Sequence, residues 1–183
     1  MDYLPTGRAL IDPFNALEKA GIREEMRIAD FGVGAVGHFL FPAAKLVGEK
    51  GHIYGVDILK TVIQANQSRM KLAGFDNIEL VWGNFERPMG SRLPDASMDM
   101  VLMVNVLHAV DRMPSLQEAK RVLHTGGILL IIEWKLAGAA LGPSPDKRIA
   151  KEPATLLGTQ MGFSLLETFE AGPHHYGLVL KKT

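Results

Sequence analysis

The sequence predicts an α/β protein built on a mostly parallel, doubly wound sheet. From about residue 26 onward, strand-like and helix-like segments alternate along the chain. The segment 98–104 is almost wholly apolar, as expected for a strand that is covered on both faces. Two last strand-like segments, 163–169 and 176–181, are separated only by a short Gly-Pro turn. Because so few residues cannot make a parallel crossover, this pair is predicted to be an antiparallel hairpin.

The individual elements follow from hydrophobic periodicity and turn residues. Residues before 26 are predicted to carry a helix, with Phe14, Leu17 and Ala20 on one side. The predicted strands are 27–31, 52–56, 78–82, 98–104, 128–133, 163–169 and 176–181. The predicted helices between them cover 36–47, 61–73, a segment that begins near 114 and ends at the glycines 126 and 127, and about 150–161. The Gly- and Pro-rich stretch 136–145 is predicted to be a loop.

Three local signals refine the helix boundaries. Pro42 lies inside the first helical pattern, so this helix should be kinked or should start late. Pro114 suits the first turn of a helix, and Ser115 with Glu118 has the spacing of a capping box. Gly74 is expected to end the second helix.

Composition excludes several classes of function. A length of 183 residues with 47% hydrophobic residues predicts one domain with a sizeable core. Lys+Arg and Asp+Glu both number 20, so the chain lacks the basic surplus of a typical nucleic-acid binder. The absence of cysteine excludes disulfides, thiolate metal sites and cysteine nucleophiles, and the histidines show no clear metal-ligand spacing. No signal peptide is visible and the longest strongly apolar run is short, so we expect a cytoplasmic protein.

A glycine turn follows the first predicted strand. It contains Gly32, Gly34 and Gly37, and Asp57 ends the next strand 20 residues beyond Gly37. Glycines allow a ligand to approach the backbone closely because no Cβ intrudes, and the start of a helix offers free N–H groups. A carboxylate at the end of the second strand can accept hydrogen bonds from both hydroxyls of a ribose. The combination predicts a nucleotide-binding site.

The pattern leaves two kinds of nucleotide open. The three glycines match the G-x-G-x-x-G pattern of dinucleotide-binding proteins, so an NAD-linked oxidoreductase is one reading. Asp30, two residues before the first glycine, and the sequence Trp82-Gly83-Asn84 after the third strand favour S-adenosylmethionine instead. The terminal hairpin is also wrong for a second mononucleotide-binding half.

These residues resemble those of class I S-adenosylmethionine-dependent methyltransferases. The likeness is greatest to the small methyltransferase-domain enzymes related to the ubiquinone/menaquinone C-methyltransferase group. The segments that carry it are 28–34, 54–57, 83–84, 99–108, 121–127 and 161–163. Two positions depart from the family pattern: Val36 stands where many members have a third glycine, and Asn84 stands where many have an acid.

The resemblance implies a Rossmann-like seven-stranded sheet of order 3-2-1-4-5-7-6 with strand 7 antiparallel. It also implies one domain over 1–183, with 1–25 as an N-terminal helical segment, and S-adenosylmethionine as cofactor. The cofactor-binding residues would be Asp30, Gly32, Gly34, Gly37, Asp57, Ile58, Gly83, Asn84, Phe85 and Asn105.

The methyl acceptor is expected beyond the carboxyl ends of the strands, where ligands sit in open α/β sheets. His108 is the first candidate for a general base, because the pKa of histidine suits this work. The residues expected to line the acceptor pocket are Trp134, His174, His175 and Tyr176. No metal, membrane or nucleic-acid partner is expected, and the predicted acceptor is a small molecule.

Two further hypotheses stay open from the sequence. A non-catalytic S-adenosylmethionine-binding module would share the cofactor motifs, because no catalytic signature accompanies them. The chain also lacks a large insertion that would cover the pocket. The acceptor site would therefore be an open cleft, or a homodimer would close it with a second subunit.

Overall fold

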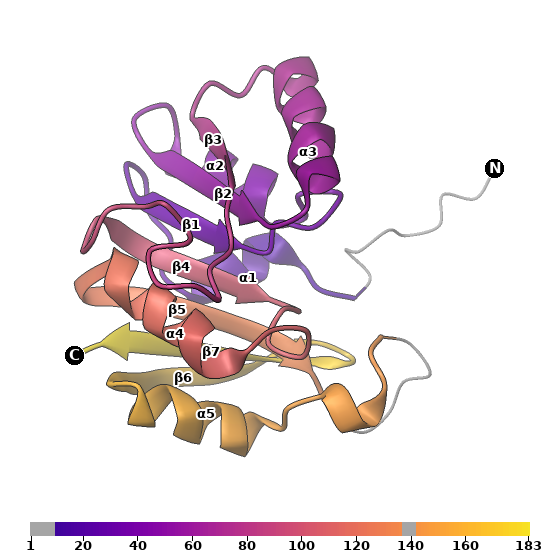
Figure 1. Cartoon of the computed structure of the whole chain (residues 1–183), viewed down its shortest axis with the longest axis vertical. Helices are drawn as coiled ribbons and strands as arrows, with labels where there is room; N and C mark the ends of the chain where they lie inside the picture. The colour runs from indigo at the N-terminus through magenta and orange to yellow at the C-terminus, as the bar shows by residue number, and fades with distance from the viewer. Residues whose placement is uncertain (1–9, 137–141) are drawn as a thin grey trace.

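The computed structural model describes residues 10–136 and 142–183, and its centre is one seven-stranded sheet (Figure 1). The strands are β1 (Arg27–Phe31), β2 (His52–Asp57), β3 (Ile78–Trp82), β4 (Met98–Val104), β5 (Leu123–Trp134), β6 (Phe163–Gly172) and β7 (His175–Lys182). Their order is β3-β2-β1-β4-β5-β7-β6, and β7 runs antiparallel to both β5 and β6. The predicted fold class, strand order and reversed hairpin are confirmed.

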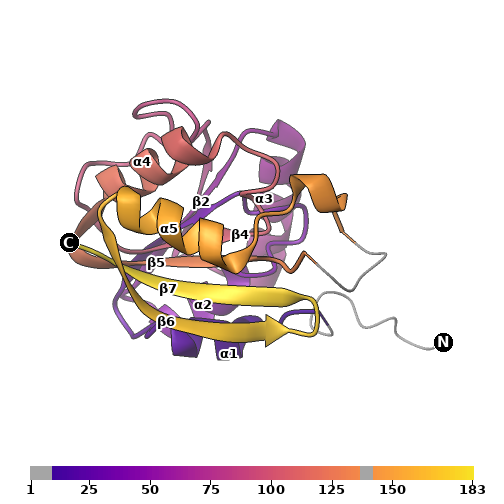
Figure 2. The ribbon, with the colours of Figure 1, turned by 90° about the horizontal axis from the view of Figure 1, so that it is seen from below.

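Helices cover both faces of the sheet. They are α1 (Pro13–Lys19), α2 (Leu40–Val47), α3 (Lys60–Ala73), α4 (Arg112–Val122) and α5 (Lys151–Gln160), with a 3-10 turn at Pro145–Lys147. The buried side chains of α4 and α5 belong to one core, and those of α1, α2 and α3 belong to the other. Figure 2 shows α4 and α5 on the side of the sheet opposite to α1 and α2.

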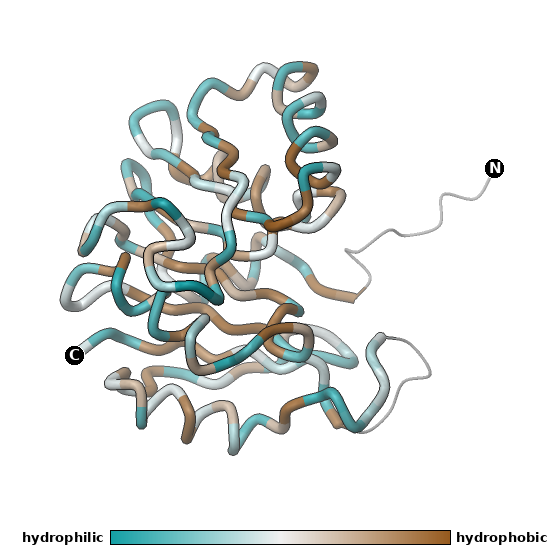
Figure 3. Tube along the Cα trace, viewed as in Figure 1, coloured by the Kyte–Doolittle hydropathy of each residue, from teal (hydrophilic) through white to brown (hydrophobic). Residues whose placement is uncertain are grey.

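Strand β4 explains why one segment is apolar throughout. Val101 and Met103 point into the core under α4, whereas Met100 and Leu102 point into the core under α2. All four side chains are fully buried, as predicted for a strand covered on both faces. Figure 3 shows hydrophobic residues along the central strands.

The structure refines or corrects three predictions about helix ends. Helix α2 starts only at Leu40, so Pro42 lies in its first turn, and Val36 is 61% exposed outside the helix. The predicted capping box is wrong: the Ser115 hydroxyl donates to the Asp111 carbonyl at 2.7 Å, and Glu118 turns to a different loop. Helix α4 ends at Val122 and not at the predicted glycines 126 and 127, which belong to β5.

Two other expectations concern loops and membranes. Part of the predicted loop 136–145, residues 137–141, lies outside the described residues. Within 10–136 and 142–183, no helix has the length and apolar character needed to cross a membrane.

Candidate functional site

The parallel strands β1 to β5 bring polar side chains together at their carboxyl edge. Asp30 lies near the end of β1, Asp57 ends β2 and Asn84 follows β3. Asn105 follows β4, and Glu133 lies near the end of β5. Because these five strands are adjacent in the order β3-β2-β1-β4-β5, residues far apart in sequence meet along one edge.

The glycine turn after β1 leaves open space at one glycine. Gly32, Gly34 and Gly37 have φ angles of 84°, 67° and 61°, in the left-handed region that disfavours side chains. A Cβ on Gly34 would meet no described atom within 4 Å, whereas a Cβ on Gly37 would lie 2.6 Å from Asn66 Oδ1. Gly34 is therefore suited to approach of a ligand, and Gly37 is required by packing within the protein.

Asn66 holds the glycine turn, and the sequence analysis missed it. Its side chain is fully buried in α3, and its Nδ2 donates to the carbonyl of Gly34 at 2.8 Å and to that of Val62 at 3.0 Å. The available signal was a polar residue four positions after the buried Val62 of the same helix. Asn66 thus holds the glycine turn from the side of α3, while the turn stays open at Gly34.

Asp57 faces the glycine turn from the end of β2. Its Oδ1 accepts the N–H of Leu59 at 2.9 Å, and its Oδ2 lies 3.4 Å from the N–H of Gly34. The carboxylate is 7% exposed, and each oxygen retains a lone pair for a further donor. The next residue, Ile58, is 53% exposed, and its carbonyl accepts the Trp82 indole N–H at 2.9 Å.

Asp30 is a buried carboxyl without a full set of partners. It is 2% exposed, and its Oδ2 has no hydrogen-bond partner among the described residues. Burial, together with the nearby charge of Asp57, raises the pKa of Asp30 to about 7. Buried polar atoms are nearly always satisfied, so an orphaned carboxylate oxygen at a strand edge points to a ligand that carries positive charge or donors.

The loop after β3 contributes Gly83, Asn84 and Phe85. Gly83 donates its N–H to the Asp57 carbonyl at 3.1 Å, and a Cβ there would lie 2.6 Å from the Gly90 carbonyl oxygen. Asn84 Oδ1 accepts the N–H of Glu86 at 2.9 Å. Phe85 is 6% exposed and stacks on Phe31 with ring centroids 4.9 Å apart.

A buried acid on α4 anchors this loop, a role that the sequence analysis did not predict for it. Glu118 accepts the N–H groups of Met89 and Ser91, each at 3.0 Å, and two hydrogen bonds from Arg121. Burial acts to raise the pKa of Glu118, but the hydrogen bonds from Arg121 and Ser91 outweigh it and hold that pKa below its usual value. Glu118 therefore links α4 to the loop that carries Asn84.

Asn105 begins the connection after β4. It adopts a left-handed φ of 52°, and its N–H donates to the Ile132 carbonyl at 2.8 Å. Its Oδ1 is buried and has no hydrogen-bond partner in the part of the chain that the structure describes. Asn105 is thus a second polar group at this edge with unused hydrogen-bonding capacity.

His108 is joined to Glu133. Its Nδ1 lies 3.2 Å from Glu133 Oε2, and Glu133 Oε1 accepts the N–H of Leu107 at 2.7 Å. The Glu133 side chain is fully buried, whereas the His108 side chain is 18% exposed. The sequence analysis placed His108 at this edge but did not pair it with Glu133.

The residues predicted to line an acceptor pocket are mostly packed inside the fold. The rings of Trp134 and His175 lie 4.1 Å apart, and Tyr176 donates its hydroxyl to the Ile149 carbonyl at 2.9 Å. Burial and the neighbouring charges of His174, Lys135 and Arg148 lower the pKa of His175 to about 4, so its ring is neutral at pH 7. Tyr176 also borders a hollow of about 260 Å³, and His174 is half-buried.

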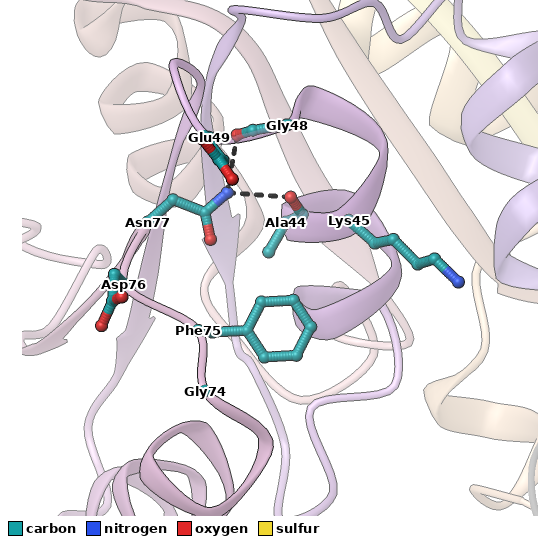
Figure 4. A pocket seen from close by; sticks show the side chains of 8 residues that line it. All are labelled: Ala44, Lys45, Gly48, Glu49, Gly74, Phe75, Asp76 and Asn77. Carbon is teal, nitrogen blue, oxygen red and sulfur yellow. Dashed lines mark hydrogen bonds between the residues drawn. The ribbon is translucent and has the colours of Figure 1, made fainter.

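A separate hollow of about 540 Å³ lies at the opposite edge of the sheet, between the end of α2 and the loop before β3 (Figure 4). None of the predicted site residues lines it. Asn77 donates to the carbonyls of Ala44 and Gly48 at 2.8 and 2.9 Å, as the dashed lines in Figure 4 show. These bonds satisfy two carbonyls at the end of α2, so the Asn77 side chain serves packing. Among the described residues there is also no group of three or more His, Cys, Asp or Glu arranged to hold a metal ion.

Comparison with known proteins places the chain in a family. The family model described as "Methyltransferase domain" matches residues 22–171. The ubiquinone/menaquinone biosynthesis C-methyltransferase UbiE of Hahella chejuensis is 31% identical over 120 residues, which are 64% of this chain and 47% of the relative. The arsenite methyltransferase of Mus musculus is 33% identical over 113 residues, 58% of this chain and 30% of the relative. The chain thus spans about half or less of the length of these curated relatives.

Solved structures extend the likeness over the whole chain. A SAM dependent methyltransferase from Aquifex aeolicus has a TM-score of 0.90 at 27% identity, over 98% of this chain and 94% of that one. The [4+2]-cyclase SpnF has a TM-score of 0.79 at 16% identity, over 93% of this chain and 79% of that one, which is a likeness of fold alone. The chain therefore belongs to the methyltransferase domain family, within the class I S-adenosylmethionine-dependent methyltransferases.

Proposed function

We propose that this chain transfers the methyl group of S-adenosylmethionine to a small organic acceptor. The observation that carries the proposal is the edge formed by Asp30, Gly34 and Asp57. Asp30 offers an orphaned buried carboxylate oxygen, Gly34 leaves open space, and Asp57 keeps lone pairs beside that space. These acceptor groups and the open space beside them fit a ligand that has a ribose and a cationic amino-acid end, as S-adenosylmethionine does.

The proposed binding roles follow the strand edge. Asp57 accepts hydrogen bonds from the ribose hydroxyls, and Asp30 together with Asn105 holds the amino-acid end. Ile58 is exposed and apolar, and it contributes to the adenine site together with Gly83 and Phe85. Asn84 Oδ1 already accepts one backbone N–H, and its second lone pair is available to the adenine amino group. Gly32 and Gly37 set the conformation of the turn.

When bound, the cofactor supplies a methyl carbon that is already activated by a sulfonium. The protein therefore works mainly by alignment, and such positioning can contribute roughly 7–11 kcal/mol in favourable cases. His108 is the proposed base for an acceptor that must lose a proton. Trp134, His174, His175 and Tyr176 are proposed to shape the acceptor side.

The absence of cysteine separates the two acceptor chemistries that the names of the relatives suggest. Arsenic(III) is a soft centre, and soft centres are held in proteins by thiolates. The 183 residues contain no Cys, so this chain has no thiolate with which to hold arsenite. An organic acceptor is therefore the proposal, as for the relatives named for ubiquinone and menaquinone synthesis.

The remaining predictions complete the proposal. We propose one domain over 1–183, a cytoplasmic location, and no nucleic-acid partner. Whether a homodimer closes the acceptor cleft is decided by the mass of the protein in solution, with and without cofactor.

The activity is tested by release of S-adenosylhomocysteine from S-adenosylmethionine. The acceptor panel contains a naphthohydroquinone, an aryl thiol, a tertiary amine and arsenite, each with boiled protein as control. We expect release with an organic acceptor and none with arsenite. Cofactor binding without release for any acceptor would instead support the non-catalytic module, and binding of NADH alone would support the oxidoreductase.

A further inference from the structure

We propose that His108 and Glu133 form one proton-accepting unit, in which Glu133 is the positioning residue. We infer that the acceptor belongs to the class of compounds that lose a proton on methylation: hydroxyl, thiol or activated carbon acids. This inference rests on the proposed function and names the acceptor class of the same site.

Two backbone N–H groups and the His108 ring surround the Glu133 carboxylate. Its two oxygens contact the backbone N–H of Leu107 at 2.7 Å, the backbone N–H of Trp134 at 3.4 Å and His108 Nδ1 at 3.2 Å. Both backbone contacts are donors, so the carboxylate acts only as an acceptor there. An imidazole nitrogen that faces such a carboxylate must carry the proton. Nδ1 of His108 is therefore the donor.

The other ring nitrogen of His108 is then left as an acceptor. In a neutral imidazole only one nitrogen carries a proton, so a protonated Nδ1 leaves Nε2 with a free lone pair. This is the tautomer that a base needs, and it is set by a side chain that is itself fully buried and unable to turn away. The partly exposed His108 ring thus has one fixed edge and one edge available to a substrate.

The segment that carries His108 is bonded to two neighbouring elements. The N–H of Asn105 is bonded to the Ile132 carbonyl at 2.8 Å, and the Leu107 carbonyl accepts Arg112 Nε at 2.9 Å. Glu133 and these two bonds tie the segment to β5 and to α4. A base must be held in place to gain from proximity, and the residues just before His108 are held by bonds to two neighbouring elements.

A second histidine–carboxylate pair in the same protein lacks these features. His124 Nε2 lies 3.1 Å from Asp99 Oδ1, but the two side chains are 43% and 36% exposed. Asp99 and His124 lie at the opposite, amino edge of β4 and β5, away from the cofactor residues. This pair is a matched control for any effect of a histidine–carboxylate contact on stability.

The proposed step moves a proton to His108 and a methyl group to the acceptor. The acceptor gives its proton to His108 Nε2 while its heteroatom or carbon forms a bond to the methyl carbon. The bond between that carbon and the sulfonium sulfur breaks, and its electron pair stays on sulfur. The imidazolium that results is stabilised by Glu133 and returns its proton to water after the product leaves. No oxidant or reductant is required.

The deciding experiment is a nitrogen-15 NMR measurement of the His108 tautomer in the whole protein. We expect the Nδ1–H form in the wild-type protein and loss of that preference in Glu133→Gln, whose amide can donate to Nδ1. Asp99→Asn should leave the His108 signals unchanged. An Nε2–H tautomer in the wild-type protein overturns the proposal, whatever the protein does with S-adenosylmethionine.

Turnover then tests the acceptor class. With the naphthohydroquinone or the aryl thiol, Glu133→Gln and His108→Ala should each lower kcat about 10²–10⁴-fold and keep the Kd for S-adenosylhomocysteine within about twofold. The kcat of the double variant should be no lower than that of the slower single variant. Turnover of the tertiary amine alone overturns the acceptor class. Cofactor binding with no turnover of any acceptor contradicts both the proposed function and the acceptor class. The NMR result still tests the pairing of His108 with Glu133 independently.

Discussion

Replacing Asp30 with Asn should stabilise the ligand-free protein and abolish cofactor binding. In the folded protein burial and the charge of Asp57 raise the pKa of Asp30 from 3.8 to about 7. The unfolded chain therefore releases this proton at lower pH than the folded protein does. Between about pH 4 and pH 7 the native state binds more protons, so the contribution of Asp30 to stability falls as pH rises. The penalty is complete above pH 7.

The size of this penalty follows from the shift. About three pKa units at 1.36 kcal/mol each amount to about 4 kcal/mol at pH 8. At pH 5 less than half of it has developed, so the stability gap between Asp30→Asn and the wild type should widen by about 2–3 kcal/mol from pH 5 to pH 8. In a chain of this length, 1 kcal/mol moves the Tm by roughly 2–4 °C.

The assay is urea unfolding of both proteins at pH 5, 6, 7 and 8 without ligand. Asp76→Asn, which removes an exposed carboxylate at the opposite edge, is the control and should show no widening gap. Two results would refute the view that Asp30 lowers the stability of the ligand-free fold. One is a difference in unfolding free energy that stays constant with pH, and the other is a variant less stable than the wild type at pH 8.

Two further predictions concern the glycine turn and the acid that anchors the loop after β3. Gly37→Ala should lower stability by more than Gly34→Ala although both glycines have positive φ, because only the new Cβ of Gly37→Ala meets Asn66 Oδ1 at 2.6 Å. Gly34→Ala should cost about 1 kcal/mol and weaken S-adenosylhomocysteine binding; equal Tm losses in the two variants would contradict this division. Glu118→Ala should cost about 3–5 kcal/mol at pH 7, because it leaves the N–H groups of Met89 and Ser91 without their acceptor and removes the buried carboxylate that accepts two hydrogen bonds from Arg121. Since its pKa is lowered, the stability contributed by Glu118 is present above about pH 4.5 and is lost as pH falls through the lowered value, so urea curves of the two proteins should converge in acid; a constant difference would be evidence against it.

The strands of the sheet were predictable because a buried parallel strand can be recognised from a short segment of sequence. Segments such as 98–104 are apolar over their whole length, and glycines or an acid mark their ends. The reversed hairpin followed from the shortness of its turn, and the strand order followed from the family resemblance. The glycine turn and Asp57 were found for the same reason, since all their signals lie within about 30 residues.

The missed features depend on contacts between distant segments. Ser115 and Glu118 have the spacing of a capping box, but Glu118 bonds to backbone groups 27 and 29 residues away. His108 and Glu133 are 25 residues apart, and only the neighbouring positions of β4 and β5 bring them into contact. The late start of α2 was foreseen as one of two outcomes of Pro42, because a proline in a helix pattern either kinks the helix or moves its start.

The most direct test of the account is calorimetric titration of the protein with S-adenosylhomocysteine, with NADH in parallel. Asp57→Ala and the exposed control Asp76→Ala are titrated under the same conditions. We expect saturable binding of S-adenosylhomocysteine to the wild type and to Asp76→Ala, loss of most of the affinity in Asp57→Ala, and no binding of NADH. Binding of NADH in place of S-adenosylhomocysteine, or near-native affinity in Asp57→Ala, would contradict the assignment of this strand edge as the cofactor site.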